Sequence, residues 1–444
     1  MERQVKVLLT SLGCDKNLVD AEMMLGLLAE AGYELTDDEE QAEAIIVNTC
    51  CFIMDAKEES INSLISYGRL KEEGKCRVLI ATGCLAQRYA GEIHQEIPEV
   101  DAIVGTASFD HIAEVLKSCL DKAPKDALED MSRAVYGKKR ILSTGGHYAH
   151  LKIAEGCDKR CSYCAIPSFR GHYRSVPIEV LTEEAKSLVQ GGVRELILVA
   201  QETTRYGIDL YGKKSLSRLL KDLSEIEELE WIRILYCYPE EIDDELIEAI
   251  ATLPKVCHYL DMPIQHCEDR ILKLMGRATR KEEIKAVIRK LRNRIPDICL
   301  RTTLITGFPG ETEEEFEALC GFVKEMAFDR LGAFAYSPEE NTAAAAMPDQ
   351  IDDEIKEQRR DEIMALQQDI AYKKAEELKG SILECIVEGT IPGEHVLVLR
   401  SYRDAPEVDG YVFTDTDREY MSGSILKLKI SGSEEYDLIG EIVQ

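Results

Sequence analysis

The sequence has no apolar run long enough to cross a membrane. A membrane-spanning helix needs about 20 predominantly apolar residues, and no stretch of the 444 residues comes close. Residues 1–20 also lack the basic segment followed by an apolar one that marks a secretory signal peptide. We therefore expect a cytoplasmic protein with no membrane partner.

Positive charge is scarce. The chain has 54 Lys and Arg against 83 Asp and Glu, a net charge of −29. Proteins that bind nucleic acids gain affinity when Lys and Arg release phosphate counterions, and an acidic surface opposes this. The charge therefore disfavours nucleic acid as a substrate and favours a basic protein partner.

The 15 cysteines cannot all form disulfides, because their number is odd. Cysteines of cytoplasmic proteins stay reduced or bind metals.

A length of 444 residues, 45% of them hydrophobic and 31% charged, fits a globular chain of about three domains.

Three of these cysteines, Cys157, Cys161 and Cys164, form a CxxxCxxC motif. This spacing lets three thiols ligate three irons of a cubic iron–sulfur cluster and leaves the fourth iron open for chemistry. A structural zinc site would need a fourth ligand, usually from a second CxxC, and none follows. A disulfide pair and chance clustering are the remaining alternatives.

Residues 1–120 alternate between buried strands and amphipathic helices. Strands are predicted at 5–10, 44–49, 77–82 and 102–105, and helices at 18–31, 53–70, after Gln87 and at 109–120. Such alternation indicates an open parallel sheet with right-handed crossovers.

Cys14, Cys50 and Cys84 each stand just beyond one of these strands, in a polar turn setting. The carboxyl ends of parallel strands line one crevice, so these three thiols should converge there as a second metal site. On spacing alone Cys51 could replace Cys50, and a lone Cys after a strand is more often a small packed hydrophobe.

Residues 121–145 are polar and weakly periodic, which predicts a linker. Residues 146–376 then contain six predicted strands separated by helices, which is typical of a partial (β/α)6 barrel. The strands are predicted at 148–154, 195–200, 231–236, 258–262, 300–306 and 331–336.

Active sites of such barrels lie at the carboxyl ends of the strands. Gln201 and Glu202 follow one strand there, and Gly307 begins a turn after another. Arg301 lies inside a strand, where an unpaired charge is costly to bury, so we expect it to meet a carboxylate. A capping or loop-stabilising role is the alternative for each.

The last segment opens with a long charged helix over 350–378, and residues 377–444 then read as short strands of a small antiparallel β-barrel. From residue 378 to 444 there are six Lys and Arg against thirteen Asp and Glu, so the charge is 6 − 13 = −7. Such a barrel should repel phosphates and attract a basic protein.

These motifs carry a family resemblance. The CxxxCxxC loop resembles that of radical S-adenosylmethionine (SAM) enzymes, and residues 11–17, 48–50 and 83–87 are similar to the N-terminal domain (1–120) of methylthiotransferases, most closely the RimO type. Residues 377–444 resemble the TRAM domain of these enzymes, and residues 400–410 resemble its RimO version. The fold expected is thus α/β, with a radical-SAM barrel in the centre.

The resemblance implies two [4Fe-4S] clusters and S-adenosyl-L-methionine as cofactors. It places Tyr163 and the turn starting at Gly307 near the adenine, and Gln201 and Glu202 near the ribose or methionine end; Arg301 is counted with these cofactor contacts. It favours Cys50 over Cys51 and leaves the catalytic residues unknown.

By the same resemblance, a carbon radical forms on an aspartate β-carbon of small-subunit ribosomal protein twelve and accepts a methylthio group from the second cluster. A flavodoxin or ferredoxin reductant and a sulfur donor are implied partners, and we expect a monomer. The alternatives are a transfer-RNA adenosine methylthiotransferase and a non-catalytic scaffold that stores iron and sulfur.

Overall fold

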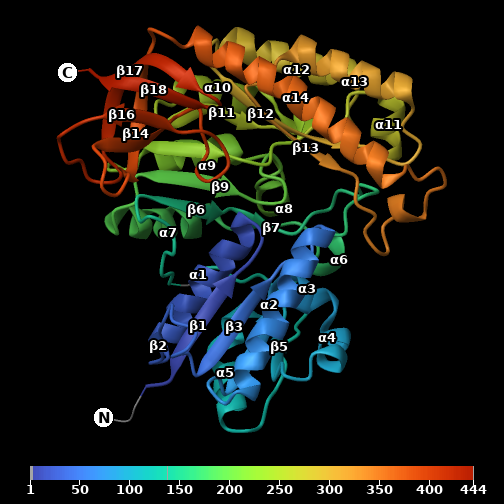
Figure 1. Cartoon of the computed structure of the whole chain (residues 1–444), viewed down its shortest axis with the longest axis vertical. Coiled ribbons are helices and arrows are strands. Elements are labelled where there is room, and N and C mark those ends of the chain that lie inside the picture. The colour runs from blue at the N-terminus through green and yellow to red at the C-terminus, as the bar shows by residue number, and fades with distance from the viewer. Residues whose placement is uncertain (1–3, 138, 444) are drawn as a thin grey trace.

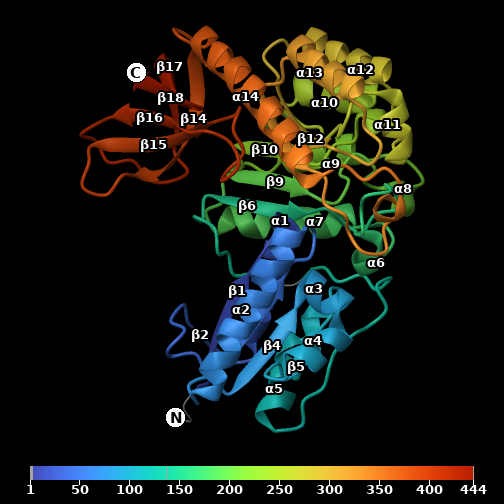
Figure 2. The same cartoon turned by 45° about the vertical axis from the view of Figure 1, so that its right-hand side comes forward.

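The computed structural model describes residues 4–137 and 139–443, which form three parts. The N-terminal part lies below a central barrel, and the C-terminal part lies against the barrel's upper flank (Figures 1 and 2). Within the described ranges, no helix is both long and apolar enough to span a bilayer.

The N-terminal part is an open, five-stranded, wholly parallel sheet in the order β2-β1-β3-β4-β5. Its strands are β1 (Lys6–Ser11), β2 (Glu34–Leu35), β3 (Ala44–Thr49), β4 (Val78–Thr82) and β5 (Ala102–Val104). The predicted sheet is confirmed, and the short β2 at its edge was not predicted.

Helices cover both faces of this sheet, because each face carries its own apolar cluster. They are α1 (Asp15–Glu30), α2 (Met54–Glu72), α3 (Gly83–Arg88), α4 (Ala90–Glu96), the 3₁₀ turn η1 (Phe109–His111) and α5 (Ile112–Leu120). Two boundaries differ from the prediction. Helix α1 begins directly after Cys14, and Cys84 lies in the first turn of α3 rather than in a connecting turn.

The central part is a six-stranded parallel sheet in the order β13-β12-β11-β10-β9-β6, which is the predicted partial barrel. Its strands are β6 (Tyr148–Lys152), β9 (Glu195–Val199), β10 (Trp231–Ile234), β11 (Val256–Asp261), β12 (Cys299–Thr306) and β13 (Arg330–Ala335). The short antiparallel pair β7 (Ala154–Glu155) and β8 (Arg174–Ser175) flanks it.

One apolar cluster packs the barrel's helices against the sheet, and a second lines its other face. The helices are α6 (Pro167–Arg170), α7 (Ile178–Gln190), α8 (Ile208–Tyr211), α9 (Leu216–Ser224), α10 (Asp244–Thr252), α11 (Asp269–Leu274), α12 (Lys281–Arg294) and α13 (Glu313–Met326), with 3₁₀ turns η2 (Pro239–Glu241) and η3 (Ala344–Ala346). The second cluster includes Ile386 and Ala405, so the C-terminal part covers that face.

The long helix α14 (Asp353–Glu377) leads to the C-terminal part, a closed barrel in the order β14-β15-β16-β18-β17. Its strands are β14 (Ile382–Thr390), β15 (Val396–Ser401), β16 (Val412–Asp415), β17 (Ile425–Glu434) and β18 (Asp437–Ile442). The barrel is not wholly antiparallel as predicted. Strands β16 and β18 pair in parallel, since β18 returns along β17 to close the barrel beside β16.

Candidate active site

The first candidate site lies at the carboxyl edge of the N-terminal sheet. Cys14 follows β1 and caps α1, Cys50 follows β3, and Cys84 follows β4. Gly13 and Gly83 allow the backbone of these loops to come close together, because each has a φ of +89°, which residues with a Cβ rarely adopt. A Cβ on Gly13 would lie 2.6 Å from Cys50 Sγ, and one on Gly83 would lie 2.4 Å from Asn48 Oδ1.

Two buried asparagines hold the loops around these thiols. Asn17 Nδ2 donates to the carbonyls of Leu12 at 2.9 Å and Thr49 at 3.0 Å. Asn48 Nδ2 donates to the carbonyl of Asn17 at 2.7 Å. The loop after β1, the end of β3 and the first turn of α1 are thus joined through these two side chains.

Burial raises the pKa of the Cys50 and Cys84 thiols, and the neighbouring Cys14 adds to the effect at both. The three sulfurs are therefore close enough to repel one another as thiolates. Such a trio ionises readily only around a cationic centre.

Cys51, the alternative to Cys50, shares an apolar cluster with Cys84. It is fully buried in an apolar cluster with Leu64 and Leu79. Burial raises its pKa to about 12, with Arg88 and Cys50 as its main charged neighbours. This setting is that of a packed thiol.

The second candidate site is the loop of Cys157, Cys161 and Cys164, between β7 and α6. Backbone contacts shape the loop. The N–H of Cys157 donates to the carbonyl of Gly171 at 3.1 Å, and the N–H of Ser162 donates to the carbonyl of Met275 at 2.9 Å. Gly276 allows this contact, because a Cβ there would lie 2.8 Å from the Arg160 carbonyl oxygen.

Burial raises the pKa of Cys157 to about 11 and of Cys164 to about 12, and Cys161 adds to both effects. The Cys161 sulfur lies 3.9 Å from the hydroxyl of Tyr238. The guanidinium carbon of Arg277 lies 4.0 Å from the centre of the Tyr238 ring. Among the described residues, Nε and Nη1 of Arg277 are buried without a hydrogen-bond partner.

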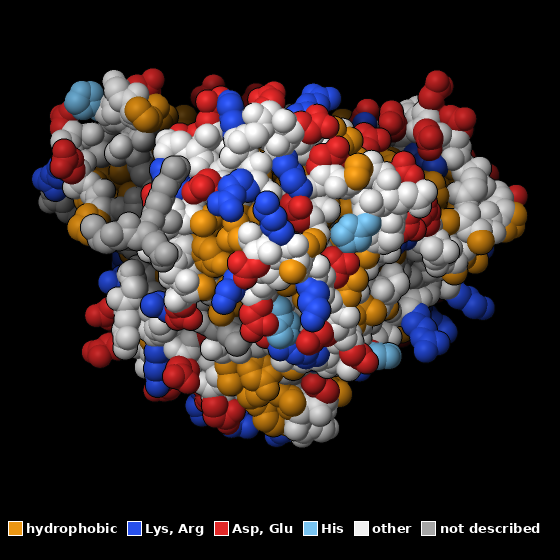
Figure 3. All heavy atoms as spheres, turned by 90° about the horizontal axis from the view of Figure 1, so that it is seen from below, with side chains coloured by type: hydrophobic (Ala, Val, Ile, Leu, Met, Phe, Trp, Pro, Cys, Tyr) orange, Lys and Arg blue, Asp and Glu red, His pale blue; other side chains and the backbone are white. Residues whose placement is uncertain are grey.

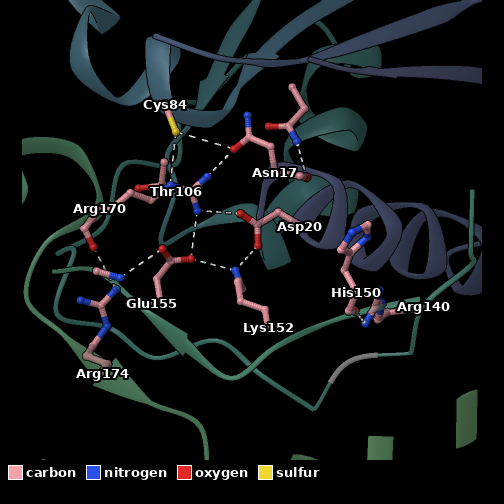
Figure 4. Close-up of polar contacts among 12 residues, drawn as sticks. Asn17, Asp20, Cys84, Thr106, Arg140, His150, Lys152, Glu155, Arg170 and Arg174 are labelled. Carbon is pink, nitrogen blue, oxygen red and sulfur yellow. Dashed lines mark hydrogen bonds and ion pairs between the residues drawn. The ribbon is translucent and has the colours of Figure 1, made fainter. Parts of the chain in front are cut away.

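A buried ionic network connects Cys84 of the first candidate site with Glu155 and Arg170, which flank the CxxxCxxC loop in sequence (Figure 4). Arg170 donates from Nε to Cys84 Sγ at 3.2 Å, and from Nη1 to Asp20 at 2.8 Å and Glu155 at 2.9 Å. Lys152 binds the same two carboxylates. Arg170 ends α6, directly after the CxxxCxxC loop, so one guanidinium connects that loop with a thiol of the N-terminal trio.

Two of the predicted cofactor contacts lie next to this network. Gln201 Nε2 donates to Glu155 Oε1 at 2.8 Å, and its Oε1 is buried without a partner among the described residues. Glu202 is 1% exposed, and burial raises its pKa to about 7 although Lys159 opposes the shift. Both residues come shortly after β9, which ends at Val199, at the carboxyl end of the barrel.

The other three predicted cofactor contacts, Tyr163, Arg301 and Gly307, lie in different settings. Tyr163 packs against the apolar cluster that contains Phe308. Arg301 pairs with Asp261 at 2.9 Å and lies 3.6 Å from Asp409, so it does meet carboxylates. Gly307 has a φ of +68°, its N–H donates to the Glu311 carboxylate at 3.1 Å, and a Cβ there would lie 2.3 Å from Lys356 Cγ. Contact of any of the three with a cofactor stays a prediction.

Sequence reasoning missed Lys16, Arg170 and Tyr236. Lys16 packs on the Tyr236 ring, and Tyr236 donates to Asp15 at 3.0 Å across the junction of the first two parts. None has a spacing motif of its own. The nearest signal was proximity in sequence, since Lys16 follows Cys14 by two residues and Arg170 follows Cys164 by six.

No group of three or more His, Cys, Asp or Glu side chains in residues 4–137 and 139–443 is arranged to hold a single metal ion. A cubic cluster has a different requirement, because each thiolate binds its own iron and the sulfurs stand farther apart. The two trios therefore stay predicted cluster ligands.

Three family descriptions match consecutive stretches of the chain. They are "Uncharacterized protein family UPF0004" over residues 6–105, "Radical SAM superfamily" over 151–323 and "TRAM domain" over 380–443. Among solved structures, a radical S-adenosylmethionine methyltransferase, TsrM, from Kitasatospora setae matches with a TM-score of 0.57 at 14% identity. The match covers 89% of this chain and 81% of that one, and it shows likeness of fold.

Curated relatives match over nearly the whole length. A protein from Lachnoclostridium phytofermentans named "Ribosomal protein uS12 methylthiotransferase RimO" is 55% identical over 98% of this chain and 99% of its own. Proteins of the same name from Desulfitobacterium hafniense and Clostridioides difficile are 47% and 48% identical, each over 99% of both chains. The chain therefore belongs to the RimO family of radical SAM methylthiotransferases.

Proposed function

We propose that this enzyme transfers a methylthio group to the β-carbon of an aspartate in ribosomal protein uS12. The observation that carries the proposal is the full-length match to proteins named for that activity. Two separate trios of thiols lie on either side of one buried junction, which supports a reaction that needs two centres.

Family membership implies an iron–sulfur cluster and S-adenosylmethionine. We propose that Cys157, Cys161 and Cys164 hold one [4Fe-4S] cluster and that Cys14, Cys50 and Cys84 hold a second. The residues present fit these groups, because each trio offers three thiols whose ionisation a cationic centre would favour.

S-adenosylmethionine has polar groups that need partners. Two nitrogens of Arg277, a neighbour of Cys161, and Oε1 of Gln201, which contacts Glu155, are buried without a hydrogen bond from the described residues. Such groups are costly unless a ligand or water satisfies them. We therefore propose that these atoms, with Glu202 and Tyr163, bind the cofactor.

When bound, the cofactors supply one-electron chemistry that can remove hydrogen from an unactivated C–H bond. The chain's own residues prepare the site for it. Arg170 keeps positive charge beside Cys84, which favours the thiolate. The buried pairs of Arg170 and Lys152 with Asp20 and Glu155 fill the junction with groups that satisfy one another.

Charge supports a basic protein substrate. Ribosomal proteins that contact RNA are generally basic, and this chain carries −29. Seen from the N-terminal side, Lys and Arg are interspersed with Asp and Glu (Figure 3). The −7 of residues 378–444 disfavours transfer RNA, the alternative substrate.

The remaining assignments are proposals of the same kind. They are a flavodoxin or ferredoxin as reductant, a separate sulfur donor, a cytoplasmic monomer, and domain boundaries near residues 120, 145 and 376.

The test is mass spectrometry of uS12 and of transfer RNA from cells with and without the gene. We expect a methylthio gain on one aspartate of uS12 that depends on the gene. A gene-dependent change in modified nucleosides with unmodified uS12 would overturn the proposal. Failure of the purified enzyme to form 5′-deoxyadenosine under anaerobic reduction would instead favour a non-catalytic scaffold.

A further inference from the structure

Helix α2 exposes a stripe of apolar side chains to solvent. Met54, Ile61 and Ile65 on this helix are 47%, 39% and 41% exposed, and Phe52, just before it, is 54% exposed. Four of the fourteen exposed large apolar residues among those described thus fall within residues 52–65. Single exposed apolar side chains are ordinary, whereas a group of them with a polar rim marks an interaction site.

The three helical residues of this stripe lie one above another. Successive residues of an α-helix turn by about 100°, so Ile61 and Ile65 return to within about 20° of Met54 and extend the stripe over about 16 Å. On the adjoining face of α2, Leu64 and Tyr67 pack into the apolar cluster of the N-terminal sheet. Leu64 and Tyr67 therefore anchor the helix, and the stripe remains open to a partner.

The exposed charges next to the stripe are all negative. Asp55, Glu58 and Glu59 are exposed. Lys57 is the only Lys or Arg in residues 52–66, and it is buried. An apolar stripe with an acidic border complements a partner that presents apolar and basic side chains together. It disfavours a second copy of this chain, because pairing two such faces brings carboxylates together.

The stripe begins at the edge of the candidate site. Phe52 comes two residues after Cys50, a thiol of the N-terminal trio. Lys57, near the start of α2, pairs with Glu339 at 2.6 Å, and Glu339 follows β13 at the carboxyl end of the central barrel. This end of α2 therefore lies where the first two parts of the chain meet.

We propose that the α2 stripe docks the substrate protein uS12 beside this junction. This inference rests on the proposed function. Ribosomal proteins that contact RNA are generally basic, so the charge of uS12 matches the acidic border of the stripe. Contacts remote from the reacting carbon strengthen substrate binding without changing the rate of the chemical step.

The test measures binding of purified uS12 to the cluster-loaded enzyme that carries Ile61→Gln together with Ile65→Gln. Loss of two apolar contacts of an interface weakens binding by roughly 10- to 100-fold. We expect that increase in Kd and in KM, with kcat at saturating uS12 unchanged. The free energy of unfolding should change little, because both side chains are exposed.

Ile355→Gln is the matched control, because Ile355 is 44% exposed and also lies on a helix, α14. We expect it to leave the Kd for uS12 unchanged. A second variant, Glu58→Gln together with Glu59→Gln, tests the acidic border. It should slow association with uS12 and make the Kd less dependent on salt, since charges at the rim of an interface act mainly on the association rate.

An unchanged Kd in the Ile61 and Ile65 double variant would overturn the inference. So would a parent dimer that this variant converts to a monomer, since the stripe would then bind a second copy. Slower reduction of the clusters by flavodoxin or ferredoxin, with unchanged binding of uS12, would assign the stripe to the reductant instead and would also overturn it. A parent enzyme that neither binds uS12 nor adds a methylthio group to it would overturn the proposed function itself, and this result is distinguishable because it involves no variant.

Discussion

Glu195 joins the barrel to the C-terminal part, and its removal should destabilise both. It is the first residue of β9 and is fully buried. Its carboxylate accepts from Arg233 Nε at 2.7 Å and also binds Arg400, which lies on β15. The change to test is Glu195→Gln, which keeps the shape and removes the charge.

The pKa of Glu195 gives the magnitude. Burial alone would raise it, but Arg400 and Arg233 lower it from 4.5 to about 2. Such a depression of the pKa corresponds to roughly 3 kcal/mol of stabilisation by the two arginines. Breaking one partner of a buried pair costs about 3–5 kcal/mol by mutation. Both arguments predict that Glu195→Gln lowers the free energy of unfolding by about 3–5 kcal/mol at pH 7.

The same pKa sets a pH dependence. Because the folded-state pKa is depressed, this stabilisation is present above pH 4.5 and is lost as the pH falls toward 2. The difference between parent and variant should therefore shrink at acid pH.

The assay is urea unfolding followed by fluorescence of Trp231, the only tryptophan in the sequence. Its side chain is 6% exposed and belongs to the cluster that contacts the C-terminal part. Glu228→Gln is the control, because its pair with Arg194 is exposed and worth under about 1 kcal/mol. Equal effects of the two substitutions would refute the reasoning.

Three further predictions concern the candidate site. Arg170→Met should lower the reduction potential of the N-terminal cluster, because it removes a cation that touches Cys84; a potentiometric titration showing no shift would contradict this. Gly83→Ala should lose the N-terminal cluster, because its Cβ would meet Asn48, whereas Gly91→Ala, with no atom within 4 Å, should keep both, as iron analysis would show. Burial raises the pKa of Glu202 from 4.5 to about 7, so ionisation of this carboxyl lowers the free energy of unfolding as the pH rises from 4.5 through 7. Glu202→Gln should therefore stabilise the protein by about 2–3 kcal/mol more at pH 8 than at pH 5 in urea titrations. An equal effect at both pH values would contradict the burial argument.

The sequence allowed the strands and the thiols to be placed because local patterns encode them. Strands such as β3, Ala44–Thr49, are continuous apolar runs, and the bounds match the prediction. The start of α3 at Gly83 was not predicted, because glycine and cysteine are weak helix formers. The backbone at Gly83 has a φ of +89°, which a sequence pattern does not indicate.

The ionic networks could not have been predicted from the same patterns. Arg170 and Asp20 are 150 residues apart, and Glu195 and Arg400 are 205 apart. Only the packing of whole domains brings such pairs together. The parallel pairing of β16 and β18 was missed for the same reason, because it depends on how the C-terminal barrel closes.

The most direct test of the account is to count iron after anaerobic reconstitution of the parent enzyme and of Cys14→Ala. Two four-iron clusters predict about eight irons per chain in the parent and about four in the variant, which should still cleave S-adenosylmethionine. A parent with only about four irons, or a Cys14→Ala variant that keeps about eight, would contradict the proposal of two separate three-thiol sites.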